Sequence, residues 1–319
     1  MKEIGGYFEL EHFHGYQPHR EAVALNCGRS CLAYLIKAKN ISKIALPVFL
    51  CDSIYETCKQ YNIETVYYPI KENFMPDEFS CDDNTWVYII NYYGQLTDLQ
   101  LISLKNKYHK IIIDNVHAYF VPPLDGVDTL YTCRKFLGVA DGAFLYTDTL
   151  LNDEFPIDLS YNRMPFLLGR LECTASEFYA GHLENESSFT NTSIKRMSKL
   201  TQNLLQAMDY KKIEFLRTEN YAYLYEHLEK INHLNLRSVK GAFAYPLFVN
   251  NAESLRMNLI EHKVYIPVLW PNILNNSDKD SLEYRMARDI LPLPCDQRYS
   301  IRDMKYICDL ISNYDHMIL

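Results

Sequence analysis

Short apolar runs alternate with stretches of helical spacing through the first half of this 319-residue chain. Strands buried on both faces are continuously apolar, as Ile111–Ile113 is. Alternation of this kind predicts an α/β fold with a mainly parallel sheet covered by helices on both faces. The expected strands are residues 44–49, 64–68, 86–91, 110–114 and 143–146, and the expected helices are residues 31–39, 52–62 and 98–107.

The pattern changes after about residue 155. Residues 163–180 and 191–231 are predicted to be mainly helical, and a smaller mixed unit begins near residue 234. In that unit we expect strands at 241–249 and 265–269, and helices at 252–262 and 301–314. We therefore predict a large α/β domain over residues 1–230, with a helical segment at 160–230, and a small C-terminal α+β domain over residues 231–319.

Charge and composition limit the partners of the protein. The net charge is −8, which argues against extensive contact with nucleic acid. No run approaches the roughly 18 uncharged apolar residues of a membrane span, and the N-terminus lacks the apolar core of a signal peptide. The nine cysteines include no Cys-x-x-Cys pair, which is typical of reduced thiols. We expect a soluble cytoplasmic protein without nucleic-acid or membrane partners.

Lys135 follows the hydroxyl-bearing segment 131–133 and precedes a turn-like stretch at 138–142. Asp114 ends the apolar run of an earlier strand, and His117 comes three residues later. This order fits a pyridoxal phosphate (PLP) site, in which a lysine amine forms a Schiff base with the cofactor aldehyde. The aspartate then keeps the pyridine nitrogen protonated, and the histidine faces the ring. Taken singly, Lys135 also fits an ordinary surface lysine, Asp114 an ordinary strand end, and His117 an ordinary core histidine.

Further residues could bind the phosphate and line the site. Gly28, Arg29 and Ser30 lie where a helix is expected to begin, and free N–H groups at such a position bind anions. Thr132 could add a second hydroxyl, and Asn91 ends a strand at the sheet edge where ligands gather. The alternative for the first group is a simple helix N-cap. No nucleophile-elbow motif and no set of metal ligands is present.

Taken together, these segments resemble the DegT/DnrJ/EryC1/StrS family of PLP-dependent sugar aminotransferases, which have fold type I. The matching segments run in the family's order over nearly the whole chain. They are 6–11, 26–30, 91–94, 114–118, 133–136, 141–143 and 293–299. The resemblance implies that Lys135 binds the cofactor covalently and that Asp114 contacts its ring nitrogen. A lysine, where some relatives that are dehydratases carry histidine, favours transamination.

The resemblance also implies a substrate and an assembly. The amino donor would be glutamate and the acceptor a keto sugar, nucleotide-linked, in polysaccharide or surface-glycan biosynthesis. The protein would be a homodimer, with Asn162 and Arg163 of the segment 161–164 reaching the cofactor pocket of the other subunit. Two alternatives stay open: another fold-type-I PLP enzyme with a non-nucleotide substrate, and a catalytically silent binding or regulatory protein. The presence of both Asp114 and Lys135 counts against the second.

Overall fold

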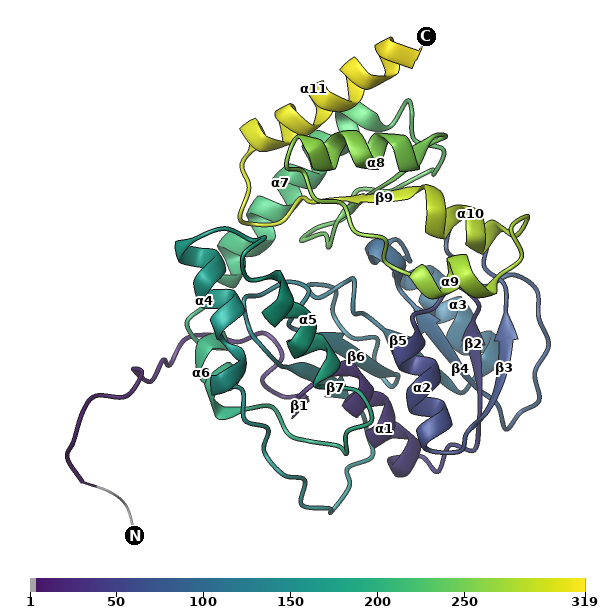
Figure 1. Ribbon diagram of the computed structural model, residues 1–319. Coiled ribbons are helices and arrows are strands. Elements are labelled where there is room, and N and C mark those ends of the chain that lie inside the picture. The colour runs from purple at the N-terminus through teal and green to yellow at the C-terminus, as the bar shows by residue number, and fades with distance from the viewer. Residues whose placement is uncertain (1–3, 319) are drawn as a thin grey trace.

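A seven-stranded sheet, in the order β1-β7-β6-β5-β4-β2-β3, forms the centre of the large N-terminal unit (Figure 1). The computed structural model describes residues 4–318. Strands β2 to β6 are mutually parallel, whereas β7 runs antiparallel to both β6 and β1. The predicted α/β class with a mostly parallel sheet is therefore confirmed. The strands are β1 (Val23–Leu25), β2 (Lys43–Pro47), β3 (Glu64–Tyr68), β4 (Trp86–Ile90), β5 (Ile111–Asp114), β6 (Asp128–Thr132) and β7 (Ala143–Tyr146).

Helices cover both faces of this sheet. Helices α1 (Gly28–Ala38) and α2 (Asp52–Gln60) pack together on one face, and α3 (Asp98–Tyr108) covers the other (Figure 1). Opposite faces are expected because right-handed crossovers that run in opposite directions along a sheet place their helices on opposite sides. Helix α3 begins with a capping box formed by Thr97 and Gln100. A short 3-10 helix, η1 (Tyr92–Gly94), follows β4 directly.

Strand β6 was not among the predicted strands. All five of its residues are buried, yet three of them are polar, so the apolar pattern of a buried strand is missing. Two of the polar groups have partners: Asp128 lies 3.5 Å from the amine of Lys39, which is distant in the sequence, and the Thr129 hydroxyl donates to the carbonyl of Val127. Polar groups that find hydrogen-bond partners can be buried at little cost. The polar residues of β6 therefore hid a buried strand from a prediction based on apolar runs.

The helical middle of the chain is more broken than predicted. It consists of η2 (Tyr161–Arg163), α4 (Pro165–Glu172), α5 (Tyr179–Ser187), α6 (Lys199–Leu205) and α7 (Tyr210–Leu228). The expected helix at 163–180 is interrupted after Glu172, because the C-cap residue Cys173 has a non-helical backbone (φ −127°, ψ −138°). In the expected helix at 191–231, the Asp209 side chain accepts from the Lys212 N–H and starts a new helix there.

The small unit lies over one end of the sheet and contains the antiparallel pair β8 (Tyr245–Phe248) and β9 (Ile290–Leu293). Around the pair are α8 (Ala252–Glu261), α9 (Pro271–Asn276), α10 (Leu282–Asp289) and α11 (Ile301–Ile318). The predicted strand at 265–269 is wrong, because this segment has no strand partner and Pro267 lacks a backbone donor. We propose that the two domains divide at residues 230/231, directly after α7.

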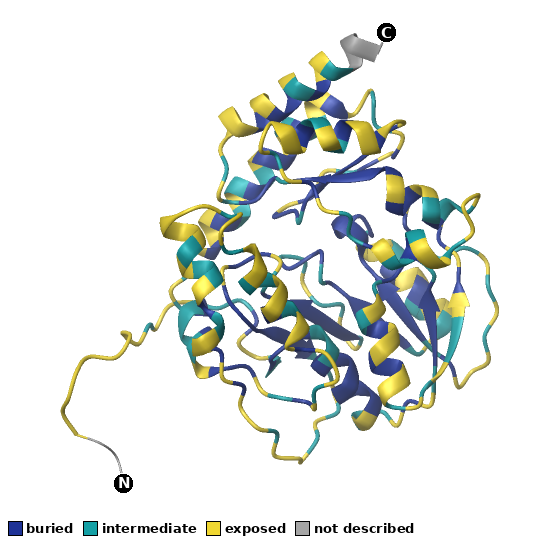
Figure 2. Cartoon of the chain, in the orientation of Figure 1, coloured by how far each residue is buried: buried dark blue, intermediate teal, exposed yellow. Residues whose placement is uncertain are grey.

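Buried side chains run from the sheet into the small unit (Figure 2). One continuous cluster includes Ile112 of β5, Leu224 of α7 and Leu247 of β8. The shared core fixes the small unit over the sheet and so defines the space between them. Among residues 4–318, no helix is both long and apolar enough to cross a membrane, and no group of three or more metal-binding side chains occurs.

Candidate functional site

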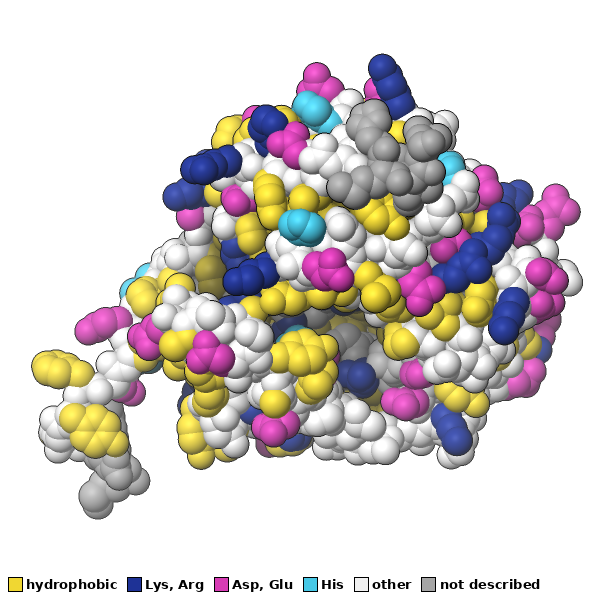
Figure 3. Space-filling model, turned by 45° about the horizontal axis from the view of Figure 1, so that its top comes forward, with side chains coloured by type: hydrophobic (Ala, Val, Ile, Leu, Met, Phe, Trp, Pro, Cys, Tyr) yellow, Lys and Arg dark blue, Asp and Glu magenta, His cyan; other side chains and the backbone are white. Residues whose placement is uncertain are grey.

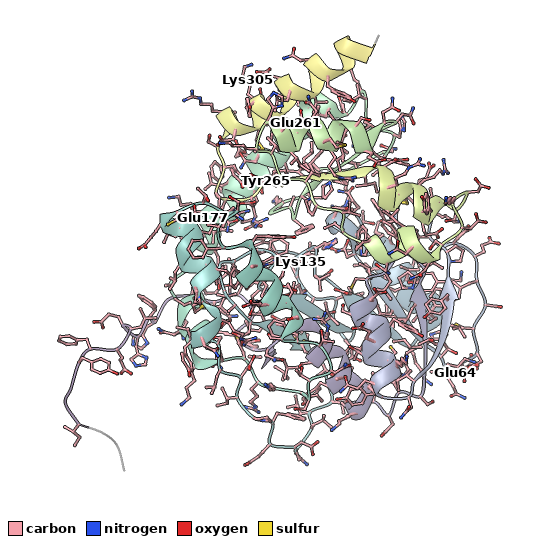
Figure 4. The ribbon with its side chains drawn as sticks, viewed as in Figure 1. Glu64, Lys135, Glu177, Glu261, Tyr265 and Lys305 are labelled. Carbon is pink, nitrogen blue, oxygen red and sulfur yellow. The ribbon has the colours of Figure 1, made fainter. Side chains whose placement is uncertain are left out.

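Three parallel strands end beside one another under the small unit. Asp114 is the last residue of β5, Asn91 follows β4, and Lys135 lies in the turn after β6. Adjacent parallel strands present their carboxyl ends at one edge of a sheet, which is where open α/β sheets bind ligands. Figure 4 shows Lys135 between the sheet and the small unit. The structure thus brings together residues that the sequence placed on separate segments.

A tight turn presents the Lys135 side chain. The carbonyl of Cys133 accepts the N–H groups of both Phe136 (3.0 Å) and Leu137 (2.8 Å). The Lys135 amine lies 3.0 Å from Nε2 of His117 and 5.5 Å from the ring centroid of Phe243. The Lys135 side chain is exposed as a whole, although surrounding protein removes much of the water from its amine. A small molecule can therefore reach Nζ.

The surroundings lower the pKa values of both Lys135 and His117. Removal of the amine from bulk water lowers the pKa of Lys135, and burial followed by the nearby lysine charge lowers the pKa of His117 far more. If the neutral imidazole accepts the long 3.5 Å bond from the Tyr93 N–H at Nδ1, its Nε2–H is free to donate to an uncharged Lys135 amine. An uncharged amine is the nucleophilic form.

Asp114 lies below the lysine and is only 3% exposed. Its Oδ1 accepts the Val116 N–H (2.9 Å), and its Oδ2 accepts the Tyr88 hydroxyl (2.7 Å). Burial raises the pKa of Asp114, whereas Tyr88, Val116 and the Lys135 charge oppose this rise. A carboxylate offers about four lone-pair positions, so Asp114 can accept one further donor. The site therefore combines an accessible amine with a buried, oriented carboxylate.

The beginning of α1 has the properties of an anion site. Its N-cap residue, Cys27, makes no side-chain capping bond, and the first turn contains no acidic residue. A Cβ atom added at Gly28 would meet nothing within 4 Å, and Nε of Arg29 has no hydrogen-bond partner among the described residues. The Ser30 hydroxyl donates to Oδ1 of Asn26 (2.7 Å). Open space, uncapped N–H groups and a cation suit a phosphate.

The remaining sequence candidates have other contacts. Asn91 is fully buried, and its side chain donates to Oδ1 of Asn115 (3.1 Å) and accepts the Leu96 N–H (2.9 Å). It therefore shapes the turn after β4. Thr132 ends β6 and is 5% exposed. The expected roles of Asn91 and Thr132 in cofactor binding stay predictions.

The contacts of Arg163, in the segment 161–164, are with residues other than Lys135. Arg163 binds the Asp158 carboxylate (2.7 Å) and the Ser188 hydroxyl (2.8 Å), and its guanidinium lies over the ring of Phe189. Asn162 is exposed. Within one chain these residues stabilise the loop around Asp158, and contact with a partner's pocket stays a prediction.

Two residues of the site, Phe243 and Arg217, were not predicted from the sequence. The ring of Phe243, just before β8, stacks on His117 with centroids 4.3 Å apart and planes 9° apart. Arg217 of α7 is 2% exposed and donates to the carbonyls of Phe136 (3.1 Å) and Ala242 (2.8 Å). It thus ties the Lys135 turn to the segment that carries Phe243. No local pattern marks these two residues, because their partners are distant in sequence.

The residues present fit PLP. The accessible Lys135 amine suits the aldehyde, the free acceptor position of Asp114 suits the protonated ring nitrogen, and the uncapped start of α1 suits the phosphate. His117 lies 3.0 Å from the Lys135 amine and can contact the ring. The fit rests on the chemical character of these side chains, which matches the aldehyde, ring nitrogen and phosphate of PLP.

Comparison with solved structures identifies the fold. No family model matches this sequence, and no curated protein matches it. A structure of S. venezuelae DesV in complex with a ketimine intermediate superposes with a TM-score of 0.66 at 14% identity, covering 92% of this chain and 84% of that one. This chain has the fold of the sugar aminotransferases. The predicted resemblance is confirmed at the level of the fold.

Two further structures support that assignment. A DegT DnrJ EryC1 StrS aminotransferase from Brucella abortus has a TM-score of 0.63 at 13% identity, covering 92% of this chain and 85% of that one. The E. coli GDP-4-keto-6-deoxy-D-mannose-3-dehydratase with bound hydrated PLP has a TM-score of 0.62 at 12% identity, with 91% and 87% covered. The sugar-aminotransferase fold therefore includes both aminotransferases and a dehydratase.

Proposed function

We propose that this protein is a PLP-dependent aminotransferase that transfers an amino group from glutamate to a nucleotide-linked keto sugar. The observation that carries the proposal is the accessible Lys135 amine, which lies 3.0 Å from His117 and beside the strand that ends in Asp114. We further propose that it acts in the cytoplasm, in the synthesis of polysaccharide or surface glycans. A lysine at this position favours transamination over the dehydratase chemistry found in the same fold.

The side chains have separate tasks in this reaction. Bound PLP would supply an aldehyde for amine exchange and a ring that takes up electrons. Lys135 Nζ would hold the cofactor and, as a free amine, would serve as general base and acid for proton transfer. Its lowered pKa leaves more of the amine uncharged near neutral pH. Asp114 would present a fixed negative charge to the ring nitrogen, and the stacked rings of Phe243 and His117 lie beside the Lys135 amine.

A cavity of about 730 Å³ between the α4–α5 segment and the small unit supports a large, phosphate-bearing acceptor. Figure 3 shows the surface hollowed between these two parts of the molecule. Arg170 and Lys263 contribute positive charge to its wall, whereas the Arg298 guanidinium is paired with Asp296 (2.7 and 2.8 Å) and the carboxylate of Asp303 adds negative charge. Tyrosine rings also line the cavity, namely Tyr179, Tyr265, Tyr299 and Tyr306. Cations suit phosphate groups, and aromatic rings suit a planar base.

The test of the proposal is covalent capture of the cofactor. Purified protein incubated with PLP is expected to gain a visible absorbance band, and borohydride is expected to fix the cofactor to the peptide that contains Lys135. Mass spectrometry of the digested protein locates the label. Absence of the band, or a label on another lysine, would contradict the proposal. Amino transfer from glutamate to a panel of nucleotide-linked keto sugars then tests the substrate.

We also predict a homodimer. The N-terminal segment extends away from the large unit (Figure 1), and Ile4, Tyr7 and Phe8 are 96%, 98% and 97% exposed. Large apolar side chains in this state are typical of a surface that a second protein covers, and a closed two-fold dimer is the simplest such assembly. Light scattering at micromolar concentration is expected to give twice the mass of the 37.4 kDa chain. An active, PLP-bound monomer would refute both the dimer and the shared site.

A further inference from the structure

We propose that Tyr88 is a positioning residue for Asp114, and that its hydroxyl holds the carboxylate in the orientation and charge state that the cofactor ring requires. The inference rests on the proposed function, since it assigns Asp114 to the PLP ring. Tyr88 belongs to β4, and no feature of the sequence singled it out. It acts through Asp114 and is therefore not assigned a direct contact with substrate.

The geometry follows from the register of two parallel strands. Tyr88 pairs with Ile112, and Ile90 pairs with Asp114, so Tyr88 and Asp114 lie one diagonal step apart on neighbouring strands. Side chains two residues apart in a strand share a face, which places the tyrosine beside the carboxylate. The hydroxyl reaches Oδ2 at 2.7 Å, while the Val116 N–H fixes Oδ1 at 2.9 Å. Both oxygens are thereby held, and the carboxyl plane cannot rotate freely.

The hydroxyl matters because Asp114 has little solvent to stabilise its charge. Tyr88 is fully buried and Asp114 is 3% exposed. Removing a carboxylate from water favours its neutral form, and a hydrogen bond to the charged form opposes that effect. Burial, followed by the charge of Asp114, raises the pKa of Tyr88 far above its usual range, so the phenol keeps its proton and remains a donor.

Other ionisable groups near Asp114 cannot replace this bond. Burial raises the pKa values of Cys31 on α1 and of Tyr92 after β4, so both stay neutral at ordinary pH. Lys135 supplies positive charge when it is protonated. The Lys135 amine must be uncharged to act as a nucleophile, and an uncharged amine no longer stabilises the negative charge of Asp114. Tyr88 and the Val116 N–H then remain as the bonds that stabilise the carboxylate.

Tyr88→Phe removes only the hydroxyl, and Tyr68→Phe is the matched control. Tyr68 on β3 is 1% exposed, and its hydroxyl donates to the backbone carbonyl of Tyr88 (2.6 Å). Burial and Tyr108, but not Asp114, raise the pKa of Tyr68. Each variant therefore loses one buried tyrosine hydroxyl, and only Tyr88→Phe loses a bond to the carboxylate. Neither substitution changes the shape of the core.

The first measurement is PLP binding, followed by absorbance and fluorescence quenching. A hydrogen bond to a charged group contributes more than one between neutral groups, so Tyr88→Phe is expected to weaken PLP binding by about tenfold or more. The pH midpoint of the bound chromophore is expected to shift as well, because the ring nitrogen faces a carboxylate that is harder to ionise. Tyr68→Phe should leave both the affinity and the midpoint within about twofold of the wild type.

The second measurement needs no cofactor. A carboxyl group whose folded pKa is raised lowers stability as the pH rises above its unfolded pKa, because the folded state must release a proton that it holds more tightly. Tyr88→Phe raises the pKa of Asp114 further. Its unfolding constant, relative to the wild type, is therefore expected to increase about tenfold more at about pH 8 than at about pH 5. For Tyr68→Phe the change should be the same at both pH values.

The outcomes separate the two proposals. If the wild type and Tyr68→Phe bind PLP at Lys135 and Tyr88→Phe behaves like Tyr68→Phe in both measurements, the positioning role is wrong and the aminotransferase proposal stands. If the wild type does not bind PLP, the proposed function fails and the role at the ring fails with it. A pH-dependent loss of stability together with weaker PLP binding, seen only in Tyr88→Phe, would support the inference.

Discussion

Lys135→Ala is expected to remove covalent cofactor binding and to lower amino transfer by roughly 10⁴-fold or more, since both attachment and proton transfer are lost. PLP should still bind through the start of α1 and Asp114, because neither contact depends on the lysine. The visible band of the lysine adduct is expected to disappear, and borohydride should no longer fix the cofactor to the protein. Absorbance, mass spectrometry and single-turnover kinetics measure these effects.

Lys240→Ala is a suitable control for Lys135→Ala. Lys240 is an exposed lysine, and its replacement should change neither the spectrum nor the rate. Stable labelling of Lys135→Ala at another lysine, with the visible band intact, would show that the cofactor attaches elsewhere. Transamination at the wild-type rate would exclude Lys135 from the chemistry altogether.

Asp114→Asn is expected to keep the fold, to weaken PLP binding at least as much as Tyr88→Phe does, and to lose on the order of 100-fold in turnover even when PLP is saturating. Asparagine is nearly isosteric, and its carbonyl oxygen can still accept the Val116 N–H. The amide cannot carry the negative charge that keeps a ring nitrogen protonated. Steady-state kinetics with glutamate measure the loss, and turnover near the wild-type value would refute the role of Asp114.

The same variant should be more stable than the wild type at alkaline pH. Because burial raises the pKa of Asp114, the wild type loses stability as the pH rises from the unfolded pKa through the folded one. Asp114→Asn removes this loss, and the difference should vanish in acid, where the carboxyl is protonated in both states. Chemical denaturation at several pH values gives the comparison.

Asp128→Asn provides the matched control. Burial also raises the pKa of Asp128, at the start of the neighbouring strand β6, where the Lys39 amine lies 3.5 Å away. Asp128→Asn therefore also changes a buried carboxylate, but at the far end of the sheet from Lys135. It should leave PLP binding and turnover unchanged. A loss equal to that of Asp114→Asn would indicate a general effect of sheet stability.

The sequence by itself determined the α/β class and the elements that carry the main site residues. Repeated apolar runs such as Ile111–Ile113 identify buried parallel strands because both faces of such strands must be covered. The carboxyl ends of these strands share one edge, so Asp114 and the residue after β4 could be placed together without coordinates. Local periodicity and chain order are sufficient for conclusions of this kind.

The sequence was less informative in two places: where a buried strand contains polar residues, and where an apolar segment has no neighbouring strand to pair with. Strand β6 is buried although Asp128 and Thr129 are polar, because both find partners, and the partner of Asp128 is the distant Lys39. The segment 265–269 has the apolar character of a strand, but it remains unpaired beside the two strands of the small unit. Strand formation depends on a neighbour, which apolar character alone does not supply.

Only the tertiary structure decided which distant side chains complete the site. The bond from Tyr88 to Asp114 depends on the register of β4 against β5, and the stacking of Phe243 on His117 depends on how the small unit lies over the sheet. Arg217 likewise joins the Lys135 turn to the small unit through backbone carbonyls. Such contacts join residues far apart in the chain, and their free energy comes from desolvation and orientation that exist only after packing.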